Sequence, residues 1–174
     1  FQYKVIAKGG TSSIFGEAIM WLKNSGIVNQ VYKTTAELPL EMHKDLSSFK
    51  LYMSDVGLFV NKARYPLYQV DLSQQPVMIA MGPLTENYVA NELRVKGYDL
   101  YYWESDGKAE LDFMIQKETD IVPIEVKTSV HTKARSLDLY MKTYSPNYAV
   151  RISEKNFGFE NNIKSVPLYA VFCI

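Results

Sequence analysis

Four charged residues in the second half of the chain have the types and the spacing of a metal-dependent phosphodiesterase site: Glu86, Asp112, Glu125 and Lys127. Carboxylate oxygens are hard ligands that suit Mg²⁺ or Mn²⁺, and these ions keep water molecules and accept phosphate oxygens. A metal ion bound by Asp112, Glu125 and Glu86 would polarise a scissile phosphate and lower the pKa of a bound water molecule. Lys127 would stabilise the charge of the transition state or position the attacking water.

The stretch AELDFMI, residues 109–115, predicts the strand that carries Asp112. Side chains alternate between the two faces of a strand, so Glu110 and Asp112 are expected to share one face. The other face is expected to be apolar and to consist of Leu111, Phe113 and Ile115. Because Glu110 has the same phase as Asp112, it either replaces Asp112 in part or pairs with a lysine.

The stretch IVPIEVK, residues 121–127, predicts the next strand along the chain. Glu125 and Lys127 are expected to share one of its faces. The opposite, apolar face consists of Val122, Ile124 and Val126. If the two strands are hairpin neighbours, Asp112 and Glu125 lie side by side, and their mutual repulsion requires a cation or a proton. Lys127 supplies one positive charge, whereas a divalent metal ion would supply two.

The stretch PLTENYVANELRVK, residues 83–96, predicts a helix with Pro83 in its first turn and Gly97 at its end. Its narrow apolar stripe consists of Val89, Ala90 and Leu93. Glu86 falls in the middle of this stripe, while Glu92 lies about 120° away around the helix and is expected in solvent. A carboxylate within such a stripe is either buried at a cost or directed at a binding partner. The alternative for Glu86 is a first-turn acid that the helix dipole stabilises.

Other polar residues near this group are expected to have ordinary surface roles. Lys133 and Arg135 open a helix predicted over residues 133–143, where they either contact a phosphate backbone or lie in solvent. His131 follows the strand predicted over residues 121–127, near a loop, and is expected to be exposed. The alternative for the strand carboxylates and the lysine themselves is a structural cluster of ion pairs on a half-exposed sheet.

The composition excludes several classes of protein. The chain has 174 residues, 47% of them hydrophobic, which suffices for a buried core in one domain or two small ones. Its formal net charge is zero, so any contact with nucleic acid depends on a local patch. Neither a run of about 18 apolar residues nor a signal-peptide pattern occurs, so no membrane partner is expected. The single cysteine, Cys173, favours a reducing, cytoplasmic setting, and its apolar neighbours predict a buried position.

The first half predicts a winged-helix-like part over residues 1–65. Residues 11–25 predict an amphipathic helix, and strands over residues 27–35 and 49–59 follow, with a loop or wing between them. Prolines and mixed polarity over residues 61–81 indicate a domain boundary there.

The second half, residues 66–174, predicts the element order αβββαβ followed by a late strand. The expected elements are the helix 83–96, the strands 98–103, 109–115 and 121–127, the helix 133–143, and the strands 147–153 and 166–174. The fold class expected for the whole chain is therefore α/β with a mixed central sheet.

This pattern resembles the PD-(D/E)XK nuclease superfamily, in which an αβββαβ core carries an aspartate and a Glu-x-Lys pair on adjacent strands. Here the motif consists of Glu86, Asp112 and Glu125-Val126-Lys127. The sequence departs from the motif that names the superfamily, because Asp112 follows Leu111 rather than a proline. The resemblance implies a restriction-endonuclease-like core, a Mg²⁺ or Mn²⁺ cofactor, and DNA as the partner.

More narrowly, the chain resembles the uncharacterised C-terminal domain that follows the ATPase core in many bacterial and archaeal AAA+-type ATPases. The resemblance rests on the stretches FKLYMSDVGLF, GPLTENYVANEL, YYWES, AELDFMI, VPIEVKTS, FGFE and VPLYAVF, in this order. It implies that an N-terminal ATPase module of the same parent protein is a partner and that ATP binds there. No G-x-x-x-x-G-K-[ST] motif occurs in the sequence, so no ATP site is expected in this chain.

Two main hypotheses follow from the sequence. The first is a nuclease-like domain of an ATPase that hydrolyses DNA at a Mg²⁺-dependent site. The second is a catalytically inactive module that binds DNA or docks onto the parent ATPase and keeps its carboxylates as relics. A transcription-type DNA binder is disfavoured because the predicted helix 11–25 has few basic residues. An oligomer is compatible with each of these hypotheses.

Overall fold

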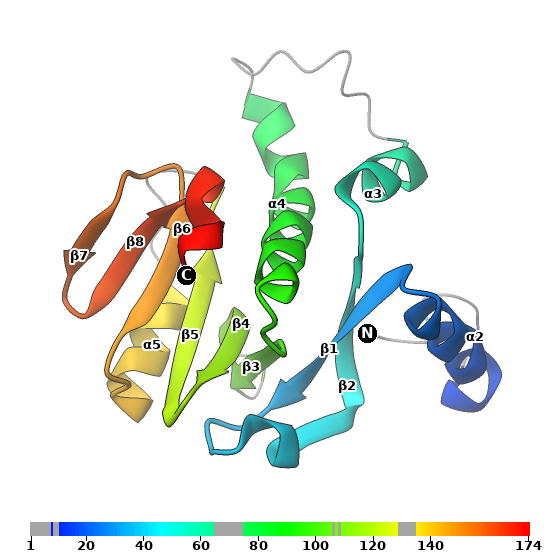
Figure 1. Ribbon diagram of the computed structural model, residues 1–174, viewed down its shortest axis with the longest axis horizontal. Coiled ribbons are helices and arrows are strands. Elements are labelled where there is room, and N and C mark those ends of the chain that lie inside the picture. Colours follow the sequence, from blue (N-terminus) through cyan, green and yellow to red (C-terminus); the bar gives the residue numbers. More distant parts are fainter. Residues whose placement is uncertain (1–7, 9–10, 65–74, 106, 108, 129–134) are drawn as a thin grey trace.

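The computed structural model describes residues 8, 11–64, 75–105, 107, 109–128 and 135–174. These residues form a mixed α/β fold around one eight-stranded sheet (Figure 1), as the sequence predicts. The strand order is β2-β1-β3-β4-β5-β6-β8-β7, with both parallel and antiparallel neighbours. The strands are β1 (Val28–Thr34), β2 (Lys44–Met53), β3 (Tyr101–Ser105), β4 (Ala109–Lys117), β5 (Asp120–Val126), β6 (Ala149–Ser153), β7 (Gly158–Glu160) and β8 (Ile163–Pro167).

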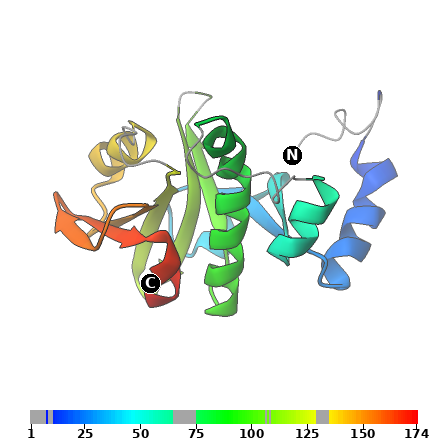
Figure 2. The same cartoon turned by 90° about the horizontal axis from the view of Figure 1, so that it is seen from above.

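Helices cover both faces of the sheet. The long helix α4 and the 3₁₀ helix η3 pack on one face, and α5 packs on the other (Figure 2). Helix α2 contacts β1, and α3 contacts β2 and α4. The helices are α2 (Ser12–Asn24), η1 (Leu40–His43), α3 (Val56–Lys62), α4 (Gln75–Val95), α5 (Arg135–Tyr144) and η3 (Leu168–Cys173). None of the described helices is long and apolar enough to cross a membrane.

Two apolar cores result, one on each face of the sheet. The α4-side core includes Tyr52, Val89, Ala90, Leu93, Tyr102, Phe113, Ile115, Val122, Ile124, Val126, Val150, Ile152, Ala170 and Val171. The α5-side core includes Leu40, Tyr101, Trp103, Leu111, Met114, Leu137, Tyr140 and Ala149. Each large apolar side chain buried in this way contributes on the order of 1.5–3 kcal/mol to stability. The sheet is thus held between two apolar layers, and charged groups within it need partners.

The elements of the second half follow the predicted order. Helix α4 leads to β3, β4 and β5, and then to α5 and β6. Helix α4 begins at Gln75, earlier than expected, so Pro83 lies inside the helix rather than in its first turn. Proline favours a first turn because it lacks an N–H donor, and here the helix continues through the position without that one hydrogen bond.

The first half contributes strands to the same sheet. The helix predicted over residues 11–25 and the strand predicted over residues 27–35 are present as α2 and β1. Strand β1 pairs antiparallel with β2 and parallel with β3, so the sheet continues across the predicted boundary between the two parts. The boundary itself adjoins residues 65–74, which lie outside the described part, and the winged-helix interpretation of residues 1–65 stays a prediction.

The strand predicted over residues 49–59 is wrong in its second half. Strand β2 ends at Met53, and the following residues form α3. Asp55 caps this helix, because its Oδ1 atom accepts a hydrogen bond from the backbone N–H of Leu58 at 2.6 Å. Such a cap satisfies a donor that the first turn of a helix leaves free. The local cap therefore outweighs the strand propensity of the apolar residues that follow it.

The strand predicted over residues 166–174 is also wrong. Strand β8 ends at Pro167, and the apolar residues that follow form η3. Ala170 and Val171 are neighbours in the sequence, yet both are buried. The 3₁₀ turn packs against α4 and places both side chains in the α4-side core. Cys173, which the sequence places in the core, is exposed at the end of this turn.

Asn87 joins α4 to the end of β2. Its side chain is buried, its Oδ1 atom accepts a hydrogen bond from the Met53 N–H at 2.7 Å, and its Nδ2 atom donates to the Met53 carbonyl at 2.9 Å. The amide thus satisfies both backbone groups of one strand residue. This link also fixes the turn of α4 that carries Glu86.

Asn87→Ala is expected to lower the free energy of unfolding by about 2 kcal/mol, because both backbone groups of Met53 lose a partner. Urea denaturation followed by circular dichroism measures this change. Asn91→Ala is the matched control on the same helix, since Asn91 accepts one longer hydrogen bond of 3.3 Å, from the half-buried side chain of Asn29. Equal losses of stability in the two variants would contradict the linking role of Asn87.

Candidate functional site

A bulge in β4 decides where Asp112 lies. Strands β3 and β4 are antiparallel, with Tyr101 opposite Met114 and Trp103 opposite Leu111. Between these two pairs β3 has one residue, whereas β4 has two, of which Asp112 is the first. An extra residue of this kind interrupts the alternation of side chains and bends the strand.

The bulge corrects the predicted faces of this strand. Leu111 packs in the α5-side core, whereas Phe113 and Ile115 pack in the α4-side core. The prediction that these three residues share a face is therefore wrong. The period of two holds only where the ladder between two strands is unbroken, and the sequence carries no local mark of the break.

Asp112 lies where β4 and β5 separate. The regular pairing of these strands ends with Phe113 opposite Ile124. Beyond this pair, the Oδ2 atom of Asp112 accepts a hydrogen bond from the Val126 backbone N–H at 2.7 Å, so a side chain replaces a backbone acceptor. Burial raises the pKa of Asp112, and the Val126 hydrogen bond opposes this rise. Strands β4 and β5 are thus the hairpin neighbours that the site requires.

Glu125 and Lys127 form the second part of the site, at the end of β5. The opposite face of β5 packs in the α4-side core, as predicted. Glu125 is 2% exposed, its Oε1 atom forms an ion pair with Lys127 Nζ, and its Oε2 atom has no hydrogen-bond partner among the described residues. Burial and the charge of Asp112 raise the pKa of Glu125 to about 7. A buried oxygen of this kind indicates a missing proton, water molecule or ligand.

Helix α4 places Glu86 beside Asp112. The apolar stripe of the helix is fully buried on the sheet, as predicted. The Tyr52 hydroxyl donates a hydrogen bond to Glu86 Oε2 at 3.4 Å. Burial and the charge of Asp112 raise the pKa of Glu86 to about 7. Burial and the charge of Glu92 raise the pKa of Tyr88, so Glu92 lies next to Tyr88 rather than next to Asp112. Glu86 is therefore the helical carboxylate that faces the site.

Strand β2 supplies two side chains that the sequence does not predict. Lys50 forms an ion pair with Glu110, and its positive charge opposes the rise in pKa of the neighbouring carboxylates. Tyr52 packs on Phe113 with a distance of 5.4 Å between the ring centroids. Strands β1 and β3 lie between β2 and β4 in the sheet, and the ion pair between Lys50 and Glu110 spans them. Alternation within β2 pairs Lys50 with Tyr52, but no local pattern directs their face to this site.

The charged side chains of this site form one group, the carboxylate cluster, in which carboxylates outnumber lysines. The carboxylate cluster consists of Lys50, Glu86, Glu110, Asp112, Glu125 and Lys127. Negative charges that lack a cation repel each other, raise each other's pKa and oppose folding when they ionise. Either protons or a divalent cation relieve this repulsion.

Comparison with protein families gives two matches. A domain of unknown function, DUF4143, matches residues 81–171, which is just over half of the chain. The chain belongs to the DUF4143 family. A second domain of unknown function, DUF8612, matches residues 1–66. Searches of the curated proteins and of the solved structures found no match.

Both matched regions contribute to the carboxylate cluster. The DUF4143 region supplies all four carboxylates and Lys127, whereas the DUF8612 region supplies Lys50 and the neighbouring Tyr52. The two regions are separate along the sequence, yet the pairing of β1 with β3 joins them in one sheet. The site therefore depends on contacts between them.

The carboxylates of the DUF4143 region fit a divalent metal ion as a pair rather than as a complete centre. Within the described ranges, no group of three His, Cys, Asp or Glu side chains is arranged to hold a metal ion. Mg²⁺ commonly uses one or two protein carboxylates and completes its shell with water and substrate phosphate oxygens. Asp112 and Glu125 meet this requirement, since they extend from adjacent strands and Glu125 Oε2 lacks a partner in the described part.

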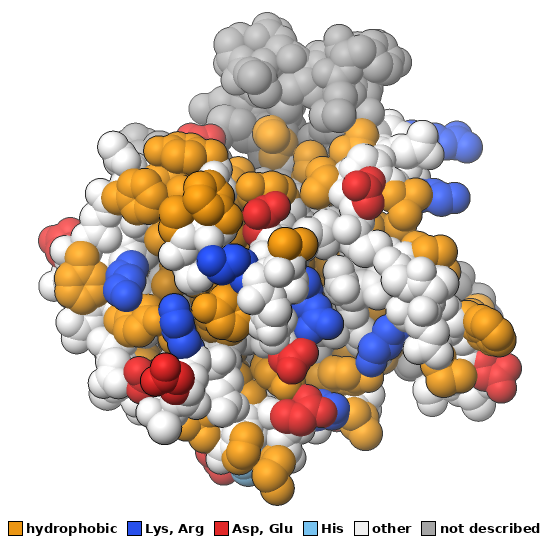
Figure 3. All heavy atoms as spheres, in the orientation of Figure 1, with side chains coloured by type: hydrophobic (Ala, Val, Ile, Leu, Met, Phe, Trp, Pro, Cys, Tyr) orange, Lys and Arg blue, Asp and Glu red, His pale blue; other side chains and the backbone are white. Residues whose placement is uncertain are grey.

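The sequence singles out three further polar residues near this site, Arg135, His131 and Lys133. Arg135 begins α5 and is exposed, which fits its expected position at a solvated helix end. His131 and Lys133 lie outside the described residues. On the face drawn in Figure 3, acidic and basic side chains are intermixed with many apolar ones. Any contact of this face with nucleic acid would therefore depend on a local group of residues.

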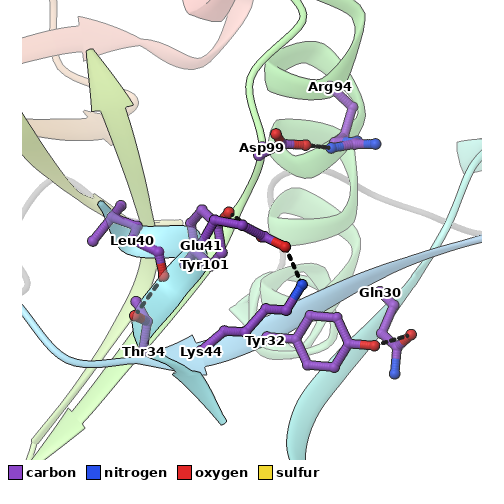
Figure 4. Close-up of polar contacts among 9 residues, drawn as sticks. All are labelled: Gln30, Tyr32, Thr34, Leu40, Glu41, Lys44, Arg94, Asp99 and Tyr101. Atoms are coloured by element: carbon purple, nitrogen blue, oxygen red, sulfur yellow. Dashed lines mark hydrogen bonds and ion pairs between the residues drawn. The ribbon is translucent and has the colours of Figure 1, made fainter. Parts of the chain in front are cut away.

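A separate cavity of about 360 Å³ lies between β1, η1 and the end of α4 (Figure 4). Four of its five described charged side chains form ion pairs with one another, and the fifth, Lys23, lies over the ring of Tyr32. Lys44 forms an ion pair with Glu41, the Tyr101 hydroxyl donates to Glu41 at 2.7 Å, and Arg94 lies 2.8 Å from Asp99. This mutual pairing makes the cavity a weaker candidate for chemistry than the carboxylate cluster of the DUF4143 region.

Proposed function

We propose that this chain is the nuclease-like domain of an ATPase and that it hydrolyses phosphodiester bonds of DNA with Mg²⁺ or Mn²⁺. The observation that carries the proposal is the buried carboxylate of Glu125. One of its oxygens pairs with Lys127, and the other has no hydrogen-bond partner among the described residues. A cation shared with Asp112, on the adjacent strand, satisfies this oxygen and neutralises the excess of carboxylates.

Each residue of the site has one role in this proposal. A bound Mg²⁺ would polarise the scissile phosphate and lower the pKa of a water molecule. Asp112 and Glu125 hold the metal ion, and Glu86 accepts hydrogen bonds from water molecules at the site. Lys127 donates to a phosphate oxygen and stabilises the negative charge that develops in the transition state.

The order of the elements supports the proposed PD-(D/E)XK-like core. Helix α4, the three strands, α5 and β6 follow each other as in the αβββαβ pattern, and Asp112 and Glu125-Val126-Lys127 lie on neighbouring strands. The proposal further assigns residues 1–65 to a winged-helix-like part, and ATP binding to a separate ATPase module of a cytoplasmic parent protein.

Titration calorimetry with Mn²⁺ tests the metal site without a substrate. The full chain is expected to bind Mn²⁺, and Asp112→Ala and Glu125→Ala are each expected to lose at least about tenfold in affinity. Glu110→Ala is the matched control, because Glu110 belongs to the same cluster but pairs with Lys50 and is exposed. Wild-type chain that does not bind Mn²⁺, or two variants that bind it as tightly as the wild type, would contradict the proposed site.

The second candidate function is a catalytically inactive module that binds DNA or docks onto the parent ATPase. One observation favours it: burial and the charge of Asp112 raise the pKa of Glu86 and of Glu125 to about 7, so protons can relieve the repulsion without a metal ion. In this case the carboxylates are relics that remain partly protonated near neutral pH, in agreement with the raised pKa values of Glu86 and Glu125. Thermal stability that does not respond to Mn²⁺ would support this function, since a ligand of the native state raises stability by mass action.

A further inference from the structure

A second cavity adjoins the carboxylate cluster on the α5 side of the sheet. It has a volume of about 610 Å³ and is lined by residues of α5, β6 and the β7–β8 hairpin, which lies at the edge of the sheet (Figure 1). The polar and aromatic side chains that line it include Asp138, Arg151, Lys155, Asn156, Phe159 and Glu160. The volume falls within the range of pockets that bind small ligands, about 300–1,000 Å³.

Arg151 connects this cavity with the carboxylate cluster. Strands β5 and β6 are parallel, and Arg151 lies opposite Glu125 in their register, so both side chains extend from the same face of the sheet. Arg151 Nε is buried and, like Glu125 Oε2, has no hydrogen-bond partner among the residues described. One donor and one acceptor without partners, on directly paired residues, indicate a place that a ligand or an ordered water molecule completes.

The β7–β8 hairpin presents an exposed aromatic ring to the cavity. Glu160 pairs with Ile163, and the two residues between them, Asn161 and Asn162, have φ angles of 50° and 59°. Positive φ at both positions is the geometry of a tight two-residue hairpin turn. Phe159 lines the cavity from this hairpin and is 63% exposed. Its ring is therefore available to stack on a planar ligand.

The polar groups of the cavity favour a nucleobase over a phosphate group alone. Arg151 and Lys155 are cationic donors, whereas Asp138 and Glu160 are anionic acceptors. A groove that tracks a phosphate backbone is mainly basic. An unpaired base instead presents donors and acceptors on its edge and a flat face for stacking. The mixture of signs next to one exposed ring matches the second kind of ligand.

We infer that this cavity binds an unpaired base next to the scissile phosphate, so that the substrate of the proposed nuclease is single-stranded DNA. The inference rests on the proposed function, because a phosphodiester at Asp112 and Glu125 brings the adjoining nucleotide to Arg151. Phe159 stacks on the base, and Arg151 donates hydrogen bonds to its edge. Lys155 contacts the next phosphate along the strand.

Fluorescence anisotropy tests this inference with the full chain and a labelled single strand of about 20 nucleotides, compared with the same strand in a duplex. Ca²⁺ replaces Mg²⁺ and Mn²⁺ in this assay, so that the carboxylates hold a divalent ion while cleavage is suppressed. The single strand is expected to bind at least about tenfold more tightly than the duplex. Phe159→Ala is expected to weaken single-strand binding about tenfold, and Phe159→Trp to retain it, because one stacked base contributes a factor of about this size. Phe172→Ala is the matched control, since Phe172 is also an exposed phenylalanine, 56% exposed, but lies in η3. The Phe172→Ala variant is expected to bind the single strand as tightly as the wild type does.

Three outcomes would overturn the inference: equal binding of single strand and duplex, unchanged binding in Phe159→Ala, or no binding of either DNA. Titration of Phe159→Ala with Mn²⁺ separates this failure from failure of the proposed function. Wild-type Mn²⁺ affinity without a single-strand preference overturns the base pocket alone. Absence of Mn²⁺ binding in the wild type overturns the metal site and, with it, the placement of the base beside a scissile phosphate.

Discussion

Lys127→Ala is expected to reduce metal-dependent cleavage of DNA at least about a hundredfold while the fold stays intact. Groups that stabilise the charge of a transition state commonly contribute factors of this size. The Lys127 side chain is only 26% exposed and pairs with the buried Glu125, so its charge acts inside the site rather than in bulk solvent. Its backbone N–H donates to the Ile152 carbonyl at 2.8 Å, a hydrogen bond that the substitution leaves in place.

Single-turnover cleavage rates of the wild type and the variant, on single-stranded and on duplex DNA, measure this effect. Lys117→Ala is the matched control, because Lys117 is an exposed lysine at the far end of β4. Lys127→Ala should still bind Mn²⁺, since the carboxylates remain. Cleavage at the wild-type rate would place the catalytic cation elsewhere. Loss of Mn²⁺ binding in Lys127→Ala would instead make Lys127 a residue that positions Glu125.

Glu125→Gln is expected to stabilise the metal-free chain at pH 8, by about 3 kcal/mol at most. The pKa of Glu125 is raised to about 7 from its ordinary value of 4.5, so the folded chain binds this proton more tightly than the unfolded chain does. Its contribution to stability is therefore complete below about pH 4.5 and is lost as the pH rises towards 7. One pKa unit corresponds to about 1.4 kcal/mol. Glutamine resembles the protonated acid and removes this loss.

The difference in the free energy of unfolding between Glu125→Gln and the wild type is thus expected to grow from pH 4.5 to pH 8. Urea denaturation at several pH values in EDTA measures this difference. Glu92→Gln, on α4 and outside the carboxylate cluster, controls for the loss of a negative charge elsewhere on the protein. A difference that stays constant across this pH range would show that Glu125 is not held in an unfavourable environment.

Mn²⁺ is expected to reverse this order of stability. A metal ion that binds the folded wild type raises its stability by mass action, whereas Glu125→Gln has lost one of the two proposed carboxylate ligands. At saturating Mn²⁺ and pH 8 the wild type should therefore regain the stability that it lacks in EDTA. Stabilisation of both proteins by the same amount would indicate that the metal ion binds at another place.

Patterns within single elements are what the sequence by itself determined about this protein. The alternation of β5 sets Glu125 and Lys127 on the face opposite the α4-side core. The helical period sets Glu86, and not Glu92, on the side of α4 that faces the sheet. The order of α4, β3, β4, β5, α5 and β6 also follows from local patterns. Each of these features depends on residues a few positions apart, where the periods of strand and helix fix the direction of a side chain.

Contacts between distant segments are what only the tertiary structure decided. The bulge in β4 directs the Asp112 side chain towards β5, and this bulge arises from the register of β3 against β4. Lys50 contacts the cluster because β1 pairs with β3 and so brings β2 into the same sheet. Arg151 meets Glu125 because β6 pairs in parallel with β5. Strand order and register depend on the burial of both faces of the whole sheet, whose strands extend from Val28 to Pro167. No pattern within a single strand or helix records these long-range contacts.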